Sequence, residues 1–321
     1  MSMLTLFKKT IKMQQAMLRC NGVPTQVITE GRWVEEGLSP NGHKDVVLVI
    51  PGNPGIPTFY TGFIKALKSC LPTETPVWVL GHAGHVLPPK MLSFSSEEDA
   101  QCRAFSLQGQ IEHKVAFAKE YIPKDARVHL VGHSIGAWLI LKLLEDEEFA
   151  KRVVKCYLLF PTIEYMAETR SGIFFTNILL RLAPLLFFLA WIFTFFPTII
   201  RNFLVRIFGV LFVGFGSQSV QPVLQLIEPE VLKRVFLMAK EEMQQVREMD
   251  HEIVSKYSDK LWLYYGATDG WTPVRYYDRL KVKHPHVDAQ LCKRGFRHAF
   301  VLSNEKDVGK MVGDLINETI H

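Results

Sequence analysis

The chain has 321 residues, a length that suits one α/β domain with an insertion or two small domains. Its formal net charge is +5 at pH 7, but lysine and arginine form no block of the kind that binds nucleic acid, so we expect no nucleic-acid partner. The five cysteines are widely spaced and include no C-x-x-C pair, which argues against a zinc site and a disulfide framework, and we expect neither a metal nor a cofactor.

Short apolar runs alternate with helical patterns along most of the chain. The apolar runs predict strands at residues 46–50, 76–80, 128–131, 153–160, 260–266 and 287–292, with one or two edge strands within 23–33. The helical patterns lie at residues 63–71, 106–122, 138–144 and 307–319, and a charged helical region covers 228–254. Continuous apolar strands that alternate with helices are typical of a mostly parallel, doubly wound α/β sheet.

Residues 171–227 interrupt this alternation. The only charged residues there are three arginines, and eleven of the chain's 22 phenylalanines lie within residues 174–215. We therefore predict an α/β core in two parts, residues 1–165 and 228–321, with a hydrophobic helical cap at 166–227 inserted between them.

The segment Gly-His-Ser-Ile-Gly at 132–136 fits the G-x-S-x-G pattern of a nucleophile elbow. A predicted strand precedes it and a predicted helix follows it, which is the context that the motif needs. Its two glycines leave the space that so tight a turn requires. The pattern also occurs by chance, and the strand and the helix are what favour Ser134 as a nucleophile. His133 is expected to point away from Ser134.

A serine nucleophile needs a base, which an acid orients. Asp269 follows the predicted strand 260–266, at the end of the sheet where ligand sites of open α/β sheets lie. Its alternative is a turn-forming aspartate, since Asp-Gly favours turns. His298 follows the last predicted strand, whereas His284 and His286 precede it, and its alternative is a plain loop histidine. The order serine, acid, histidine is the order expected for this elbow.

The negative oxygen of a tetrahedral intermediate needs hydrogen-bond donors in place beforehand. The N–H of Ile135, directly after the nucleophile, is one candidate. The other is the N–H of Asn53 in the glycine-rich loop after the first core strand, because Pro54 has no N–H. The alternative for Asn53 is a turn-forming residue between glycine and proline.

These motifs together resemble the α/β-hydrolase superfamily over nearly the whole chain, and within it the lipid droplet-associated hydrolase family. The resemblance rests on the apolar insertion and on the segments at 49–55, 132–136, 266–269 and 297–300. Pro51 stands where the superfamily more commonly has histidine. The resemblance implies an esterase for neutral lipids on the cytosolic face of lipid droplets and of the endoplasmic reticulum, with sterol esters as the family's suggested substrate.

Residues 182–200 carry no charge and nearly reach the ~20 residues that span a bilayer. A single span would separate Ser134 from Asp269 and His298, so a working triad excludes it. A second span at 203–215 would be too short and would contain an arginine.

We therefore expect residues 172–216 to form a hairpin or interfacial helices that dip into one leaflet or a droplet monolayer, interrupted at Pro184 and Pro197. The alternatives are a buried lid and an anchor at residues 1–18.

The predicted function is a serine ester hydrolase, in which Ser134 attacks an acyl carbonyl, His298 moves the proton and Asp269 holds the imidazole. The alternative is a droplet- or endoplasmic reticulum-associated protein that keeps the hydrolase fold, turns over slowly and organises droplets. A thioesterase or an acyltransferase would use the same triad. The expected partners are a lipid ester and a lipid surface, and the acyl group, the alcohol and the oligomeric state stay open.

Overall fold

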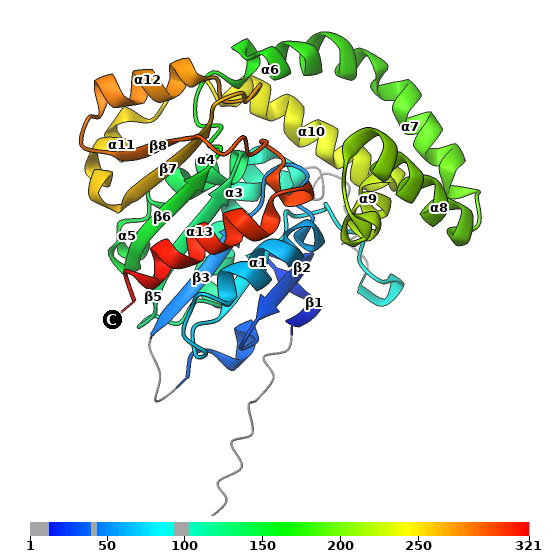
Figure 1. The fold of residues 1–321 in the computed structure, drawn as a ribbon. Coiled ribbons are helices and arrows are strands. Elements are labelled where there is room, and N and C mark those ends of the chain that lie inside the picture. Colours follow the sequence, from blue (N-terminus) through cyan, green and yellow to red (C-terminus); the bar gives the residue numbers. More distant parts are fainter. Residues whose placement is uncertain (1–12, 40–43, 93–102, 321) are drawn as a thin grey trace, which may run out of the picture.

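The computed structural model describes residues 13–39, 44–92 and 103–320 (Figure 1). Within them, eight strands form one sheet in the order β1-β2-β4-β3-β5-β6-β7-β8. β2 is antiparallel to β1 and β4, and the other neighbours are parallel. The strands are β1 (Met13–Cys20), β2 (Val23–Glu30), β3 (Asp45–Ile50), β4 (Val77–Leu80), β5 (Arg127–His133), β6 (Val153–Leu159), β7 (Leu261–Gly266) and β8 (Asp288–Cys292). This arrangement confirms the predicted mostly parallel α/β sheet.

Helices cover both faces of the sheet. The helices are α1 (Thr61–Lys68), α3 (Leu107–Glu120), α4 (Ile135–Leu143), α5 (Glu147–Arg152), α6 (Arg170–Phe174), α7 (Leu180–Thr194), α8 (Thr198–Phe208), α9 (Val220–Ile227), α10 (Pro229–Gln245), α11 (His251–Lys256), α12 (Val274–Lys283) and α13 (Glu305–Asn317). Val47 and Val49 of β3 belong to the same buried cluster as residues of α1 and α13, whereas Leu48 and Ile50 belong to the cluster on the other face, with residues of α3, α4 and α12. Because both faces of β3 are buried, its sequence is a continuous apolar run rather than an alternating one.

β1 is a strand that the sequence pattern does not predict, and the helices α5 and α12 are likewise absent from the predicted elements. β1 pairs with β2 as a hairpin, and the connecting residues Asn21 and Gly22 both have positive φ, 51° and 75°. Asn-Gly is the residue pair that such two-residue turns favour. β1 escaped the prediction because it is an edge strand with most of its side chains exposed or half-buried, so its sequence has no clear apolar run.

The apolar insertion forms helices between β6 and β7 that arch beside the sheet (Figure 1). α6, a π-helix at Phe175–Leu179 and α7 form one continuous helix, Arg170–Thr194. By length and composition it could cross a membrane, with a mean hydropathy of 2.0 and 17% of its most apolar stretch buried. The expected break at Pro184 is wrong, because Pro184 lies inside α7, whereas Pro197 does separate α7 from α8. The π-helix just before α7 already alters the regular hydrogen-bond pattern there.

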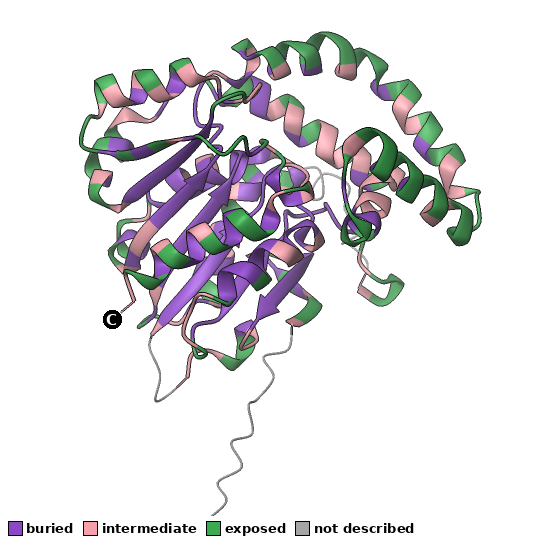
Figure 2. Ribbon diagram, in the orientation of Figure 1, coloured by how far each residue is buried: buried purple, intermediate pink, exposed green. Residues whose placement is uncertain are grey.

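α10 lies beneath this long helix and joins it to the core. The ring of Phe236 on α10 lies 5.6 Å from that of Phe175 and 5.4 Å from that of Phe187, measured between ring centroids. The side of α10 that faces the core carries Met238, which is fully buried. The long helix is therefore supported from one side, and its outer surface is exposed (Figure 2).

Candidate active site

Ser134 lies alone between the end of β5 and the start of α4, with φ 54° and ψ −122°. Positive φ is unfavourable for a residue with a side chain, and here the tight turn imposes it. A Cβ on Gly132 would lie 2.8 Å from Cα of Ala137, and a Cβ on Gly136 would lie 2.2 Å from the carbonyl oxygen of Ile50. The two glycines of the motif are thus required by close backbone approach, as the sequence predicts.

The structure brings Ser134, His298 and Asp269 together. His298 Nε2 lies 2.9 Å from Ser134 Oγ, and His298 Nδ1 lies 2.6 Å from Asp269 Oδ2. Because the carboxylate accepts at Nδ1–H, Nε2 is left to accept the serine hydroxyl. This is the hydrogen-bond order that activates a serine nucleophile.

Asp269 makes the contacts expected of both alternatives, a triad acid and a turn-forming aspartate. Its Oδ1 accepts from the N–H of Trp271 at 2.7 Å, which is a turn contact, while Oδ2 accepts from His298 and from the Thr272 hydroxyl. Burial acts to raise the pKa of the Asp269 carboxyl, but the charge and hydrogen bond of His298 and the donors of Trp271 and Thr272 outweigh it and lower the pKa. Asp269 is thereby held as a carboxylate beside the imidazole of His298.

His133 points away from the triad hydroxyl, as expected, but it contacts the loop of the base. Its Nε2 lies 2.9 Å from the carbonyl oxygen of His298, and its Nδ1 lies 2.7 Å from Tyr60 Oη. A carbonyl only accepts, so Nε2 of His133 donates and Nδ1 accepts the Tyr60 hydroxyl, whose oxygen accepts from the N–H of Gly52 at 2.8 Å. Burial first, and then the charge of His298, lower the pKa of His133 to about 3 and keep this ring neutral.

This buried chain of hydrogen bonds joins the glycine-rich loop to the loop of the base. Tyr60 was not identified from the sequence as a functional residue. The signal was its place directly after the glycine-rich loop, but nothing in the sequence shows that its hydroxyl reaches His133.

The glycine-rich loop lies against the elbow. A Cβ on Gly52 would lie 3.0 Å from Cβ of Ser134. Asn53 does not contact the serine through its side chain; its Nδ2 donates to the carbonyl oxygen of Val235 at 3.0 Å and to Glu242 Oε1 at 2.9 Å, both on α10. The side chain of Asn53 therefore fastens the loop to the cap side of the molecule.

Ile135 is the first residue of α4 and is fully buried. Its N–H belongs to the first turn of that helix, where backbone donors have no partner within the helix and the helix dipole is positive.

Thr162, which the sequence did not single out, contacts Ser134 through two groups. Its N–H donates to the carbonyl oxygen of Ser134 at 3.3 Å, and its Oγ1 lies 3.5 Å from Ser134 Oγ.

Comparison of the sequence with known proteins shows which family the chain belongs to. The profile described as "Lipid-droplet associated hydrolase" matches residues 43–301. The chain belongs to this family. It is 42% identical to the lipid droplet-associated hydrolase of Drosophila melanogaster, in an alignment that covers 95% of this chain and 99% of the relative. It is 33% identical to that of Homo sapiens, in an alignment that covers 98% of each chain. The rat relative is 36% identical over 97% of each chain.

Solved structures show the fold of this lipid droplet-associated hydrolase family member. The thioesterase domain of the curacin biosynthetic pathway matches with a TM-score of 0.60 at 14% identity, covering 94% of this chain and 99% of that one. A variant of the deformylase Nfo from Pseudomonas putida S16 matches with a TM-score of 0.59 at 13% identity, with the same coverage. The chain has the α/β-hydrolase fold, as its motifs imply.

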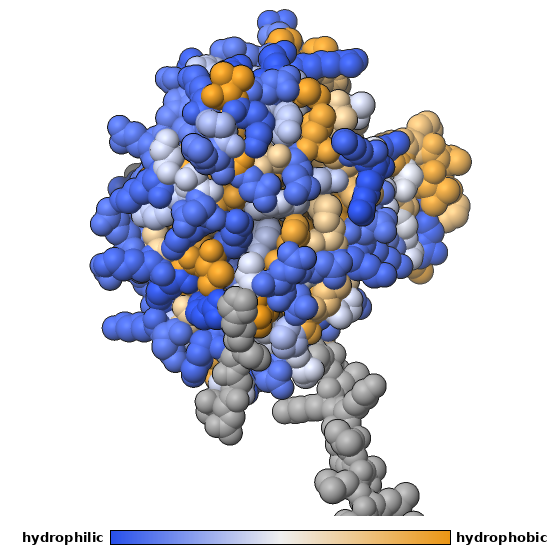
Figure 3. All heavy atoms as spheres, turned by 60° about the vertical axis from the view of Figure 1, so that its left-hand side comes forward, coloured by the Kyte–Doolittle hydropathy of each residue, from blue (hydrophilic) through white to orange (hydrophobic). Residues whose placement is uncertain are grey.

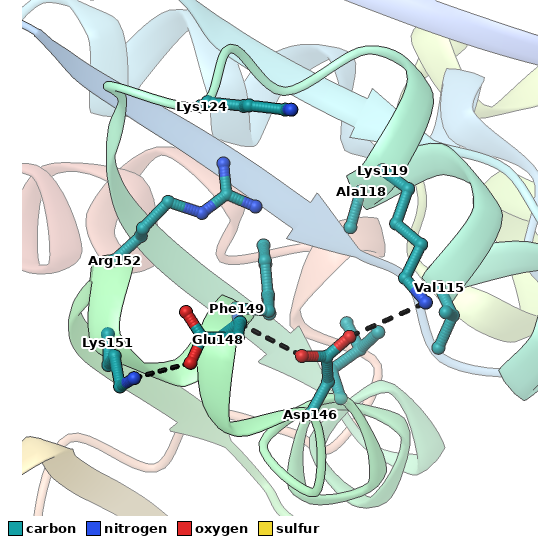
Figure 4. Close-up of a pocket in the computed structure, with 10 residues that line it drawn as sticks. Val115, Ala118, Lys119, Lys124, Asp146, Glu148, Phe149, Lys151 and Arg152 are labelled. Atoms are coloured by element: carbon teal, nitrogen blue, oxygen red, sulfur yellow. Dashed lines mark hydrogen bonds and ion pairs between the residues drawn. The ribbon is translucent and has the colours of Figure 1, made fainter.

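One cavity of the family member lies away from the elbow, between α3 and α5 (Figure 4). Its volume is about 480 Å³ and its rim is mostly charged. Lys119 lies 3.6 Å from Asp146, Lys151 pairs with Glu148, and Arg152 donates to the carbonyl oxygen of Pro123 at 2.9 Å. No residue of the triad lines it, and charged groups paired with one another do not suit an apolar ester.

No group of three or more histidine, cysteine, aspartate or glutamate side chains that could hold a metal occurs within residues 13–39, 44–92 and 103–320.

Proposed function

We propose that the protein is a serine ester hydrolase that acts on neutral lipids, sterol esters among them, at the surface of lipid droplets. One observation carries this proposal: the Ser134 hydroxyl lies 2.9 Å from His298 Nε2 at a strained elbow, and Asp269 holds the other ring nitrogen at 2.6 Å. Membership of the lipid droplet-associated hydrolase family supports the lipid substrate.

In this reaction Ser134 Oγ attacks the acyl carbonyl while His298 Nε2 takes its proton. The buried carboxylate of Asp269 stabilises the imidazolium that forms. When the tetrahedral intermediate collapses, the same proton passes to the leaving alcohol, and an acyl-serine remains. A water molecule, deprotonated by His298, then releases the fatty acid and restores the serine.

The negative oxygen of the intermediate requires donors beside Ser134. We assign this role to the N–H groups of Ile135 and Asn53. Their support is position: Ile135 begins α4, and Gly52 holds the loop within contact distance of Ser134. The side-chain bonds of Asn53 to α10 leave its backbone N–H as the group offered to the substrate.

We further propose that residues 172–216, within a cap at 166–227 between core parts 1–165 and 228–321, attach the protein to lipid. Among the described residues, the exposed large apolar side chains all lie in this segment except four. The four are Leu87, Met91, Leu237 and Val282. An apolar surface so concentrated is unusual in a soluble monomer and typical of interaction sites. Figure 3 shows hydrophobic side chains gathered on the protruding part of the molecule.

The path of the chain favours attachment to one side of a lipid layer. β6 and β7, the strands before and after the insertion, are neighbours in the sheet and pair in parallel. Both ends of the insertion therefore return to one folded core, which a single crossing of a bilayer would prevent. A droplet monolayer suits such one-sided attachment, because it has no second aqueous side. We therefore assign the protein to the cytosolic face of lipid droplets and of the endoplasmic reticulum.

Labelling with a fluorophosphonate probe tests the chemistry. We expect covalent labelling of the intact protein, loss of labelling in Ser134→Ala, and hydrolysis of emulsified lipid esters that the same substitution abolishes. A protein that does not label but still changes droplets, with the effect kept in Ser134→Ala, would instead be an organiser of droplets. A preference for dissolved short-chain esters over emulsified lipid would count against the lipid surface as the place of reaction.

A further inference from the structure

A second cavity lies where the cap meets the loop of the catalytic acid. Its volume is about 500 Å³, within the range of ~300–1,000 Å³ typical of ligand pockets. Its apolar lining comes from Phe174, Phe175, Leu179 and Trp271, and Arg170 is the charged residue among those that line it.

One wall of this cavity belongs to the triad loop. Trp271 follows Asp269 by two positions and donates its N–H to Asp269 Oδ1 at 2.7 Å. The ring of Trp271 lies 6.4 Å from the imidazole of His298, centroid to centroid. A molecule held against Trp271 is therefore one side chain away from the catalytic base.

The opposite wall belongs to the apolar surface of residues 172–216. Phe174 is 50% exposed, and its neighbours Ile173 and Ile178 are 50% and 44% exposed. The cavity thus adjoins the surface proposed to contact lipid on one side and the triad loop on the other.

Two local features hold the walls together. Ser171 donates its N–H to the carbonyl oxygen of Gly270 at 3.0 Å, and a Cβ on Gly270 would lie 2.4 Å from Ser171 Oγ. A side chain at position 270 would therefore displace the Ser171 hydroxyl at this contact. The π-helix at Phe175–Leu179 begins and ends on lining residues, and such wide turns are frequent at functional sites.

We propose that this cavity binds the acyl chain of the ester as it passes from the lipid surface to Ser134, so that Leu179, Phe174 and Trp271 select for chain length. The inference rests on the proposed function. An unbranched chain fits the chemistry because the walls are aromatic and aliphatic, while Arg170, which is exposed, can remain at the headgroups or in water. Each methylene buried against these walls adds to binding, so long chains gain most.

The experiment compares two substitutions to tryptophan. Leu179→Trp fills the cavity, whereas Val282→Trp places the same side chain on α12, at an 81% exposed position outside both the cavity lining and residues 172–216. For each protein, kcat and KM are measured with C4 and C16 4-nitrophenyl esters in mixed detergent micelles, and the rate of fluorophosphonate labelling at Ser134 is recorded.

We expect Leu179→Trp to lower the C16-to-C4 ratio of kcat/KM by about 10-fold, the scale of discrimination by an apolar pocket. Val282→Trp should leave the ratio unchanged. An unchanged ratio in Leu179→Trp, with Ser134 still labelled, overturns the cavity assignment and leaves the proposed function standing. Absence of labelling in the unmodified protein removes the proposed function itself.

Should Leu179→Trp not fold, Phe174→Ala tests the same cavity from its exposed rim. We expect it to raise KM for the C16 ester several-fold with little change in kcat, because it removes a wall rather than a reacting group. An unchanged KM would overturn the proposal. Inhibition by free palmitate that Leu179→Trp weakens would identify the fatty acid product as an occupant as well.

Discussion

His298 is held at three points: its Nδ1 by Asp269, its Nε2 by Ser134 and its carbonyl oxygen by His133. The first two contacts define the chemistry of the ring, and the third fixes the backbone that carries it. Tyr60 connects this third contact to the glycine-rich loop. The positions of the proposed base and of the proposed oxyanion donors are therefore coupled through the side chains of Tyr60 and His133.

Tyr60→Phe tests this coupling. Without the hydroxyl, the N–H of Gly52 and Nδ1 of His133 lose their partner, and buried unpaired groups cost about 1–3 kcal/mol each. We expect folded protein with kcat lowered about 10-fold or more and slower fluorophosphonate labelling. The matched control is Tyr157→Phe, whose hydroxyl donates to the carbonyl oxygen of Leu315, away from the site. Equal activity in the two variants would show that Tyr60 has a structural role alone.

Glu242, the acceptor for Asn53, gives a prediction on stability. Burial raises its pKa to about 8, against the lowering effect of the hydrogen bond from Asn53. The folded protein keeps this proton up to about pH 8, whereas an unfolded chain releases it around the ordinary glutamate pKa of 4.5. The stabilisation that the raised pKa of Glu242 adds to the free energy of unfolding is therefore fully present below pH 4 and is lost as the pH rises towards 8.

Glu242→Gln keeps the acceptor and removes the titration. We expect the free energy of unfolding of the variant, relative to the unmodified protein, to rise between pH 5 and pH 8 by about 1.4 kcal/mol per pH unit. Urea unfolding at the two pH values measures it. The control is Glu248→Gln, which removes a carboxylate whose side chain is 68% exposed. A difference between Glu242→Gln and the parent that is the same at both pH values would contradict the assignment.

At the scale of elements, the sequence predicted the strand–turn–helix unit of the elbow, although both elements begin earlier than the predicted ranges 128–131 and 138–144. An apolar strand, two glycines and an apolar helix are local features, and the structure places them at Arg127–His133, Ser134 and Ile135–Leu143. The partners Thr162 and Trp271 were not readable, because they lie in other loops that only the sheet brings to Ser134. The helical and apolar character of the insertion was readable too, but its path was not, because that path depends on contacts with α10.

Gly136→Ala tests the packing of this unit. The added Cβ would lie 2.2 Å from the carbonyl oxygen of Ile50, so β3 and α4 must separate. Overpacking of this kind costs about 1–3 kcal/mol or more, and we expect lower thermal stability and loss of labelling at Ser134. Gly37→Ala, where no atom lies within 4 Å of the added Cβ but φ 61° and ψ −158° lie in a region that almost only glycine adopts, should show only the backbone cost of about 1–3 kcal/mol and normal labelling.

At the scale of the whole molecule, hydrophobic exposure is uneven. The sheet and its covering helices bury their apolar faces, whereas α7 and α8 carry theirs outward (Figure 2). Composition alone indicated this asymmetry, since eleven phenylalanines lie within residues 174–215. It could not indicate which side chains point outward, because that depends on how α10 supports the long helix.

Two similarly exposed aliphatic residues test the lipid-binding surface. Ile199 on the insertion is 83% exposed and Val282 on α12 is 81% exposed. Burying an isoleucine in lipid is worth about 1.5–3 kcal/mol, so Ile199→Ser should weaken binding to phosphatidylcholine-coated triolein emulsions about 10-fold or more. Val282→Ser should bind like the unmodified protein. Equal binding of the two variants would place the lipid contact elsewhere.

The position of the insertion between two neighbouring strands also determines the order in which the chain can fold during translation. β6 ends at Leu159 and its sheet partner β7 begins at Leu261, so the ribosome makes the whole apolar segment before that pair can form. At about 5–20 residues per second, the wait lasts seconds, while the acid and the base are still unmade. During this interval the apolar segment 172–216 is exposed on a nascent chain whose core is still incomplete. Early capture by a chaperone or by lipid would protect the segment from aggregation. Under the proposed lipid attachment, binding to lipid and completion of the fold would then occur together.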